Sequence, residues 1–387
     1  MMNKVSSGDE ANEITPENLK QQIADGEEFL IIDIRPSSDF EEWSIDPGKG
    51  EILNISRSEL EGEVSSELEK EAEDASSVIV TCAKGESSKP VARSLDQELE
   101  TEAKILEDGM EGWATIYEKE SFELENGELV QYRRPSSGCL AYLVKSEEEA
   151  VVIDPLRSFT DTYIEDSEEL KYAFDTHIHA DHISGVRDLG ERDETTPVIP
   201  EASRDRDVQY IDEVETVEDG ETLQVGDVEI KAVHTPGHTT GMTSYLIDGK
   251  ALATGDGLFV ESVARPDLEK GDDGAPDQAA MLYETLQEKI LSMDDDVYIA
   301  PGHFSDSAEK HEGLYMRKVG ELKEEMEPLS YSEEEFVDFI LEDMPPRPSN
   351  YQDVISTNLG KQSVSDKEAF EMELGPNNCA ATEESMA

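Results

Sequence analysis

The sequence predicts an α/β protein that consists of two successive α/β domains and a C-terminal extension. Three observations predict this class. The chain has 387 residues, which is long enough for two to three domains. Its N-terminal third alternates short apolar runs, typical of buried strands, with helix-like segments. Farther along the chain, apolar strand-like runs each end in a histidine or an aspartate.

The first predicted domain spans residues 12–120. Residues 29–34 (FLIIDI) and 78–81 (VIVT) have the pattern of buried strands, and Cys82 follows the second strand at once in a glycine-containing loop. An amphipathic helix is predicted over residues 90–99. Backbone N–H groups and the dipole at a helix N-terminus stabilise a thiolate, which is the nucleophilic form of cysteine. We therefore expect Cys82 to be catalytic, and the same loop would hold a persulfide anion.

This domain resembles the rhodanese family of sulfurtransferases in residues 32–35 (IDIR), the loop from Cys82 to Ser88, and residues 106–113 (LEDGMEGW). The resemblance implies that Cys82 carries sulfane sulfur and exchanges it with sulfite or a carrier thiol, in a direction that stays open. The family's loop usually has an arginine where this chain has Ser87. That loss puts thiosulfate handling in doubt, although Lys84 could compensate in part. A domain that serves only for docking is the alternative.

Residues 177–182 (HIHADH) place four potential metal ligands in six positions. Three imidazoles and a carboxylate gain more from water than from one another unless a cation binds them. Side chains at positions i and i+2 of an extended segment point the same way, so His177 and His179 could share one metal ion. Asp181 and His182 would then face a second metal ion or orient the other ligands.

Three downstream strand ends supply further ligands of the same kinds. The motifs TPGH, TGD and PGH offer His238, Asp256 and His303 at the ends of apolar strand-like runs. His234, at the end of the strand that precedes His238, is interpreted as a structural or supporting residue. His311 lies in a charged, helix-like stretch and is expected to be solvated.

The order HxHxDH, TPGH, TGD, PGH resembles the metallo-β-lactamase superfamily. The resemblance implies a four-layer αββα sandwich over residues 121–340, with a metal site at one edge of the two sheets. Residues 341–387 would form the C-terminal extension.

Two kinds of metal centre are compatible with these ligands. With all of them engaged, the site could hold two Zn²⁺ ions bridged by Asp256 and hydrolyse an ester, a lactam or a thiolester. With His177, His238 and Asp256 alone, the site becomes a two-histidine-one-carboxylate face that suits non-haem Fe(II). The remaining ligands would then orient those three and relay protons: His179, Asp181, His182 and His303.

Residues 262–268 (SVARPDL), 344–351 (MPPRPSNY) and 374–380 (LGPNNCA) resemble elements of the persulfide dioxygenase family. The resemblance implies one Fe(II) per chain and oxidation of the sulfane sulfur of a low-molecular-weight thiol persulfide to sulfite by O₂. Arg265 would hold an anionic part of the substrate, with a salt bridge as its alternative role. The alternative function is a thiolester hydrolase of glyoxalase II type that holds one or two Zn²⁺ ions and has a rhodanese docking domain.

The other cysteines do not suggest a disulfide framework, because the chain has three cysteines in all. Cys139 begins a strand-like run and is expected to be a buried core residue rather than a catalyst. Cys379 is either free and reactive or without a special role. This cysteine usage, with no apolar segment near the N-terminus, favours a reducing cytoplasm.

The charge is extreme: 93 acidic residues stand against 32 basic ones, for a net charge of −61. In molar salt the Debye length falls to about 3 Å, which removes most of the repulsion, so the composition favours the cytosol of an extreme halophile. A nucleic-acid partner is not expected, because phosphate contacts need clustered Lys and Arg. No apolar run reaches the roughly 18 residues of a membrane span. The expected partners are a persulfide or thiosulfate and O₂, and a homodimer would be ordinary for the family.

Overall fold

Two compact units make up the chain, and each is described by itself. The structure, a computed structural model, describes residues 12–60, 65–192, 194–305, 307–342, 344, 345, 347 and 350–375. The first unit consists mainly of the residues up to Tyr117, and the second consists mainly of the residues from Glu118 onward. Cys379 lies outside the described residues.

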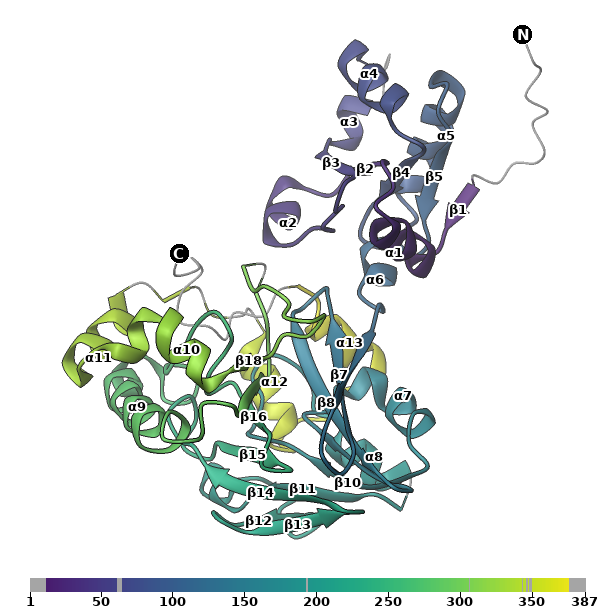
Figure 1. The fold of residues 1–387 in the computed structure, drawn as a ribbon. Coiled ribbons are helices and arrows are strands. Elements are labelled where there is room, and N and C mark those ends of the chain that lie inside the picture. The colour runs from purple at the N-terminus through teal and green to yellow at the C-terminus, as the bar shows by residue number, and fades with distance from the viewer. Residues whose placement is uncertain are drawn as a thin grey trace. The chain divides into compact units, whose positions relative to one another are not determined.

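The first unit is a five-stranded parallel sheet with helices on its faces and the strand order β1-β5-β4-β2-β3 (Figure 1). Its strands are β1 (Asn12–Ile14), β2 (Leu30–Asp33), β3 (Glu51–Asn54), β4 (Val78–Thr81) and β5 (Ala103–Leu106). Its helices are α1 (Pro16–Asp25), α2 (Ser37–Glu42), α3 (Arg57–Leu60), α4 (Ser66–Asp74), α5 (Ser88–Glu98) and α6 (Gly109–Trp113).

The central strands β2 and β4 are buried over their whole length, as strands covered on both faces must be. Leu30 and Ile32 of β2 pack into one apolar cluster with α4 and α5, whereas Ile31 packs into another with α1 and α6. The predicted strands and the rhodanese-like α/β domain are confirmed. The predicted helix of residues 90–99 begins two residues earlier, at Ser88, and ends at Glu98.

The second unit contains two mixed sheets. The seven-stranded sheet has the order β12-β11-β10-β9-β8-β7-β6, and the six-stranded sheet has the order β13-β14-β15-β16-β17-β18. The first consists of β6 (Glu118–Glu123), β7 (Glu128–Arg134), β8 (Cys139–Ser146), β9 (Glu149–Ile153), β10 (Glu169–Phe174), β11 (Thr196–Pro200) and β12 (Glu215–Val217). The second consists of β13 (Thr222–Val225), β14 (Val228–His234), β15 (Thr243–Ile247), β16 (Ala251–Gly255), β17 (Tyr298–Pro301) and β18 (Arg317–Lys318).

The two sheets pack face to face around one apolar cluster, to which Tyr142 of β8, Phe174 of β10 and Tyr245 of β15 contribute. Helices cover the outer faces, so the four layers of the predicted αββα sandwich are confirmed (Figure 1). The helices are α7 (Thr160–Glu165), α8 (Val186–Arg192), α9 (Gly271–Thr285), α10 (Val319–Glu325), α11 (Glu333–Glu342), α12 (Tyr351–Asn358) and α13 (Asp366–Met372). Shorter helical turns are η1 (Arg157–Phe159), η2 (Glu201–Arg206), η3 (Leu286–Ile290) and η4 (Glu327–Ser330).

The predicted C-terminal extension is helical and belongs to the second unit. Ser365 and Glu368 form a capping box that starts α13, in which each side chain bonds to the other residue's backbone N–H. Val354 of α12 and Ala369 of α13 pack against Ile183, just beyond the histidine-rich loop. The extension is therefore held against the segment that carries the predicted metal ligands.

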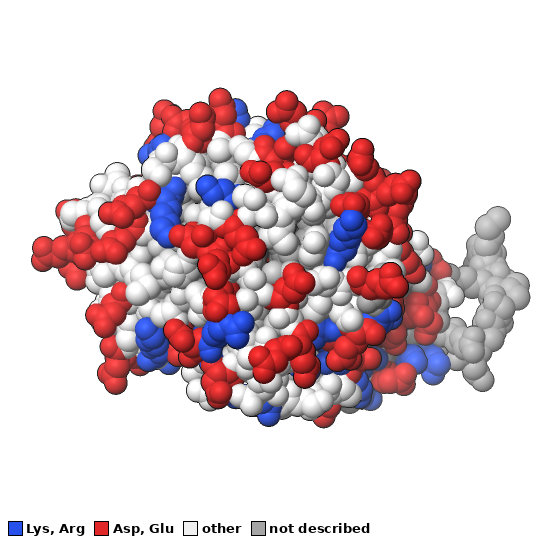
Figure 2. Space-filling view, turned by 90° about the horizontal axis from the view of Figure 1, so that it is seen from below, with Lys and Arg blue, Asp and Glu red and all other residues white. Residues whose placement is uncertain are grey.

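The surface matches the composition. Figure 2 shows one face on which acidic side chains are scattered widely among far fewer basic ones. Within the described part of the chain, no helix combines the length and the apolar character that a membrane crossing requires.

Candidate metal centre

Strand direction brings the predicted ligands to one edge of the sandwich. β15 is antiparallel to both β14 and β16, and β17 is parallel to β16, so β14, β16 and β17 all run the same way. Their C-terminal ends lead to His238, Asp256 and His303. The histidine-rich loop begins after the C-terminal end of β10, where His177 is fully buried and His179 is 2% exposed.

Three of these residues form a compact buried group: His177, His238 and Asp256. Asp256 Oδ2 lies 3.7 Å from His177 Nε2 and 3.6 Å from His238 Nε2. All three atoms are buried and have no hydrogen-bond partner among the residues that the structure describes. Leaving three such polar atoms unsatisfied would cost several kcal/mol in total. A cation that all three bind removes that cost, so this donor set fits a metal ion.

In each of the three residues, the ring nitrogen or carboxylate oxygen that faces away from the group is in contact with a neighbouring residue. His177 Nδ1 lies 2.9 Å from Thr176 Oγ1, and His238 Nδ1 donates to the backbone carbonyl of Arg265 at 2.8 Å. Asp256 Oδ1 lies 2.5 Å from His303 Nδ1. With Nδ1 of His238 as the donor, its Nε2 carries the lone pair that a metal ion needs.

The imidazoles of the group are poised as neutral ligands. Burial, helped by the charge of neighbouring His179, holds the pKa of His177 well below its usual 6.5. Burial also lowers the pKa of His238, against the opposing pull of Asp256. Metal ions bind neutral imidazole, so these shifts favour coordination over protonation.

His179 belongs to a different group, with Asp154 and Asp175. Its Nε2 lies 3.1 Å from Asp154 Oδ1 and 3.6 Å from Asp175 Oδ1. Burial and the charge of His182 lower the pKa of His179, but the two carboxylates outweigh them and raise it to about 9. The i, i+2 spacing suggested that His177 and His179 share a metal ion, whereas the structure turns them toward different carboxylates.

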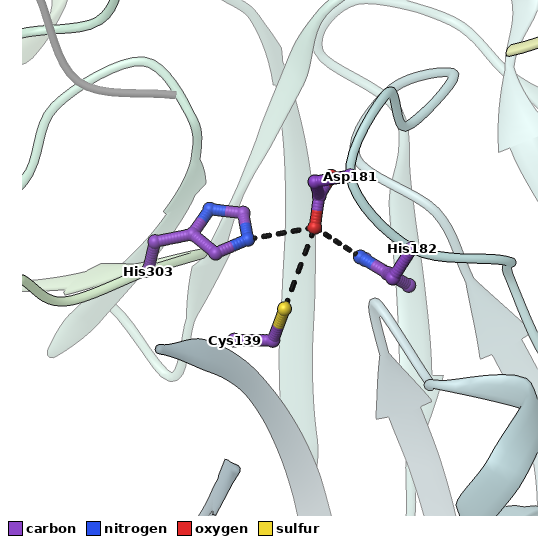
Figure 3. A group of neighbouring side chains, drawn as sticks. All are labelled: Cys139, Asp181, His182 and His303. Atoms are coloured by element: carbon purple, nitrogen blue, oxygen red, sulfur yellow. Dashed lines mark hydrogen bonds and ion pairs between the residues drawn. The ribbon is translucent and has the colours of Figure 1, made fainter. Parts of the chain in front are cut away.

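The third group contains Asp181, His182 and His303, together with Cys139 (Figure 3). Asp181 Oδ2 is central, at 2.7 Å from His182 Nδ1, 2.9 Å from His303 Nε2 and 3.4 Å from Cys139 Sγ. Burial opposes the charged imidazolium forms, but Asp181 holds the pKa of His182 well above 6.5, and Asp256 and Asp181 do the same for His303.

Cys139 was expected to be a core residue. It is buried, but its thiol lies against Asp181. An isolated β-bridge pairs Cys139 with His303 across a long gap in the sequence, and nothing local in the sequence indicates that pairing.

Asp154, which contacts His179, is a site residue that the sequence patterns did not indicate. It directly follows the buried strand β9 and adopts a left-handed conformation, with φ of 52°, which aspartate tolerates. Its carboxylate accepts from Thr176 N at 2.7 Å and from Thr176 Oγ1 at 2.9 Å, and so fixes the start of the histidine-rich loop. The apolar run before it, ending in Asp-Pro, is the signal that could have found it.

Asn358 of α12 also touches this loop. Its Nδ2 donates to the carbonyls of His179 at 3.0 Å and His182 at 2.8 Å, and its Oδ1 accepts from Ser184 N at 3.0 Å. Glu373 Oε1 accepts from Ile183 N at 2.8 Å. The end of the helical extension therefore satisfies the backbone of the ligand loop.

Arg265 is 1% exposed and forms an ion pair with Asp267, with Nε 2.7 Å from Oδ1. Arg347 Nε reaches the other oxygen of Asp267 at 2.6 Å. The backbone carbonyl of Arg265 is the group that holds His238. The salt bridge that was the alternative role of Arg265 is thus present in the structure, and its role in substrate binding stays a prediction.

In the first unit, Cys82 directly follows β4 and is 6% exposed. Its Sγ lies 3.7 Å from Ser88 Oγ, which donates to the carbonyl of Gly85 at 2.7 Å. Lys84, the residue expected to compensate for the missing arginine, forms an ion pair with Glu111 at 2.8 Å.

The remaining histidines lie outside the three groups. His234 Nε2 donates to the backbone carbonyl of Thr240 at 3.0 Å. Thr240 lies two residues after His238, so this bond fits the predicted supporting role of His234. His311 is exposed, as expected, but it sits in a short turn bridged to Leu314 rather than in a helix.

Comparisons with known proteins agree with these two folds. The family model of the metallo-beta-lactamase superfamily matches residues 135–303, and that of the rhodanese-like domain matches residues 15–116.

Individual relatives divide between two activities. Persulfide dioxygenase ETHE1 of Bos taurus is 30% identical over 244 residues, which cover 60% of this chain and 87% of that protein. Hydroxyacylglutathione hydrolase of Brucella ovis is 33% identical over 135 residues, which cover 35% of this chain but 48% of that protein. The crystal structure of ETHE1 from Myxococcus xanthus superposes with a TM-score of 0.51 at 28% identity, covering 60% of this chain and 99% of that one.

Proposed function

Since the chain belongs to the ETHE1-like family of the metallo-β-lactamase superfamily and carries a rhodanese-like domain, we propose that it is a persulfide dioxygenase coupled to a sulfurtransferase. Its substrate is a low-molecular-weight thiol persulfide. The persulfide anion, O₂ and water give the thiol, sulfite and a proton. The sulfane sulfur is oxidised and its bond to the thiol sulfur is broken.

One observation carries this proposal. The Nε2 atoms of His177 and His238 lie 3.7 and 3.6 Å from Asp256 Oδ2, and none of these three buried atoms has a hydrogen-bond partner among the described residues. His179, His182 and His303 have raised pKa values and lie against carboxylates instead. This division favours one ion held by two histidines and one carboxylate, which is the ligand set of non-haem Fe(II) oxygenases. His177, His238 and Asp256 would hold the iron, which would supply open coordination positions for a persulfide and O₂.

The protein's own residues prepare that site. Thr176 and the carbonyl of Arg265 fix the two imidazole rings, and His303 holds Oδ1 of Asp256, the oxygen that does not face those rings. His303 also contacts Asp181, so a proton on either ring nitrogen has a carboxylate to accept it. This chain of contacts is suited to supplying the proton that the released thiolate needs. Arg265 would act on the substrate only if it left Asp267.

At Cys82 the proposed reaction is sulfane-sulfur transfer. The Cys82 thiolate would attack the outer sulfur of a donor persulfide R–S–SH, forming Cys–S–SH as the donor's S–S bond breaks and R–S⁻ leaves. A second thiolate or sulfite would then attack the same outer sulfur, leaving as a new persulfide or as thiosulfate and freeing Cys82. The loop's cation, Lys84, is already paired with Glu111, which favours a persulfide over the dianion thiosulfate as donor.

The test is oxygen uptake by the iron-loaded full-length chain in high salt, with glutathione persulfide as substrate and sulfite measured as product. We expect uptake with iron and none with zinc at equal occupancy. The Cys82→Ser variant should keep oxygen uptake and lose sulfur transfer, whereas Cys379→Ser, a matched cysteine control, should keep both.

A zinc-dependent thiolester hydrolase is the second candidate, because the matched segment of the Brucella hydrolase has the higher identity. Against it, that match covers less than half of the hydrolase. Purified protein that retains zinc, hydrolyses an acyl-glutathione thiolester and consumes no O₂ would replace the first candidate with this one.

A further inference from the structure

We propose that η2 and the turn of residues 239–241 form a binding site for a small monovalent anion, chloride, centred on Arg206. This site shares no residue with the three groups of possible metal ligands. It adds a ligand to the chain rather than a step to the proposed reaction, and chloride binding there does not depend on the dioxygenase activity.

Arg206 is a buried cation that has no hydrogen-bonded counter-ion among the described residues. Its side chain is 9% exposed, and its Nη1 is buried without a hydrogen-bond partner. The carboxylate of Glu269 approaches Arg206 Nε only to 4.0 Å, which is outside hydrogen-bond distance. Both oxygens of Glu269 accept from Thr240 instead, from its backbone N at 2.6 Å and its Oγ1 at 2.7 Å. Because arginine keeps its charge, burial without a bonded anion is costly.

Arg265 shows how this chain treats a buried arginine elsewhere. Arg265 is 1% exposed and donates to both oxygens of Asp267, at 2.7 and 3.1 Å. The chain has 93 acidic residues, yet no carboxylate in the described part of the chain lies within hydrogen-bond distance of Arg206. An anion from the solvent would fill for Arg206 the place that Asp267 fills for Arg265.

A buried hydroxyl lies on the same face of η2 as Arg206. Ser203 precedes Arg206 by three residues, and side chains at that spacing in a 3₁₀ helix lie one above the other. Ser203 is fully buried, whereas Arg204 and Asp205 between them are exposed. Ser203 Oγ has no hydrogen-bond partner among the described residues. The inward face of η2 therefore presents a hydroxyl and a guanidinium that both lack an acceptor.

That inward face packs on the turn of residues 239–241. A Cβ added at Gly241 would lie 2.9 Å from Ser203 Oγ, so a larger residue there would displace the serine. Glu269, which holds the turn, is also the carboxylate beside Arg206. Both inward-facing residues of η2 are thus next to the turn that follows His238.

The turn contributes a third hydroxyl. Thr239 is 3% exposed, and its Oγ1 has no hydrogen-bond partner within the described ranges. Two segments in contact therefore carry three buried donors that lack an acceptor, namely Arg206 Nη1, Ser203 Oγ and Thr239 Oγ1.

The donor types and their burial select the ligand. Hydroxyl and guanidinium groups can all donate to one acceptor, and chloride accepts several hydrogen bonds and donates none. A water molecule would accept as well, but it carries no charge to offset that of Arg206. Buried donors also favour a monatomic ion over a carboxylate or a phosphate, which needs more room. Chloride would bridge η2 to the turn and stabilise the folded chain by mass action.

The first experiment locates the ion with bromide, which replaces chloride and is identified by anomalous diffraction. Crystals of the full-length chain grown in KBr should show an anomalous peak within hydrogen-bond distance of Arg206 Nη1. Arg206→Gln, which stays polar but loses the charge, should lose the peak. Arg204→Gln is the matched control, because Arg204 lies on the exposed side of η2 and pairs with Glu201. This variant should keep the peak.

The second experiment separates anion binding from general screening by salt. The midpoint of thermal unfolding is compared in KCl and in potassium gluconate at equal concentration, since gluconate is too large for a buried site. Wild type and Arg204→Gln should unfold about 2–4 °C lower in gluconate, as expected when a ligand present at several times its dissociation constant is removed. Arg206→Gln should lose most of this difference, although both salts still screen its surface.

A wild-type crystal with no bromide at Arg206 would overturn the proposal, and so would a peak that survives Arg206→Gln. A peak at Arg206 without a midpoint difference between the two salts would show an adventitious ion only and would also overturn it. If Arg206→Gln fails to fold, the two wild-type measurements still decide. Neither experiment measures oxygen uptake, so a failure of the proposed function would leave the anion site standing.

Discussion

At the scale of residues, the site separates imidazoles by what each ring faces. His177 and His238 face an aspartate oxygen, Oδ2 of Asp256, that accepts no hydrogen bond within the described part of the chain, and burial lowers the pKa of both rings. His179 and His182 are equally buried, yet each is in contact with a carboxylate that stabilises its charged form. Neighbouring histidines of one loop thus acquire different chemistry from their partners alone.

Replacing Asp256 tests the first group. Asp256→Asn keeps the shape of the side chain but removes the only carboxylate among the three donors. We expect iron affinity and oxygen uptake to fall by at least about a hundredfold, since even residues that merely orient ligands contribute up to that much. Metal analysis after dialysis and an oxygen electrode measure the two effects. Asp353→Asn, at an exposed position of α12, is the matched control and should change neither.

Asp267 gives a pH-dependent prediction. Burial opposes its charge, but Arg265 and Arg347 outweigh burial and lower the pKa of this carboxyl below its usual 3.8. A carboxyl whose pKa is lower in the folded state than in the unfolded state stabilises the fold at pH values above its unfolded-state pKa. That stabilisation is lost as the pH falls through the folded-state pKa. Asp267→Asn should cost about 3 kcal/mol of unfolding free energy at pH 7, because the buried guanidinium of Arg265 would lose the carboxylate charge of its ion pair.

Denaturant unfolding at several pH values measures this cost. The difference between wild type and Asp267→Asn should be constant above about pH 5 and shrink below about pH 4. Asp277→Asn, on the exposed side of α9, serves as control. A difference that does not vary with pH would mean that the charge of Asp267 is not what stabilises the fold.

At the scale of elements, helices at the end of the described chain complete the metal loop. Asn358 bonds to three backbone groups between His179 and Ser184, and Glu373 bonds to a fourth. An irregular loop has no strand pairing of its own to satisfy its N–H and C=O groups, so Asn358 of α12 and Glu373, the residue after α13, do so. The helical extension therefore has a positioning role.

Asn358→Ala should loosen the loop. Three hydrogen bonds to buried backbone groups disappear, which should cost about 1–3 kcal/mol of unfolding free energy. Iron affinity should fall about 10- to 100-fold, because the ligands keep their identity but lose their alignment. Metal competition and thermal unfolding are the measurements. Gln352→Ala on the exposed face of the same helix should have no effect, and an equal loss there would refute a specific role for Asn358.

The sequence predicts the elements better than it predicts their contacts. Strand patterns and turn motifs place His238, Asp256 and His303 at strand ends, because local alternation and Pro-Gly turns are visible in a single sequence. The bridge between Cys139 and His303 depends on how two sheets meet, and no local pattern encodes it. Likewise, nothing around Asn358 indicates that it bonds to a loop more than 170 residues earlier.

At the scale of the whole molecule, the net charge of −61 governs the conditions under which the chain folds. Acidic residues are spread along the whole sequence and are scattered over the face that Figure 2 shows, so their repulsion is not confined to one patch of that face. Salt reduces this repulsion by shortening the Debye length from about 10 Å at 0.1 M to about 3 Å at 1 M. We propose on this ground that the protein works in a concentrated salt solution.

The midpoint of thermal unfolding should therefore rise as KCl is increased from about 0.1 M to 1 M, most steeply at the low end, where screening changes fastest. Differential scanning calorimetry at fixed pH measures the midpoint. At a pH near the sequence pI of about 4.2 the same series should show a weaker dependence, since few net charges remain. A midpoint independent of KCl at neutral pH would contradict the proposal.

The contact between Asn358 and the histidine-rich loop also sets an order of events during synthesis. A ribosome makes the ligand loop long before it makes Asn358 and Glu373, which lie 174 to 190 residues farther along. Until those residues emerge, the loop's backbone groups lack their final partners, and the ligands cannot hold their final alignment. Metal insertion should consequently follow translation of α13, so a nascent chain arrested before Asn358 would be a poor iron acceptor.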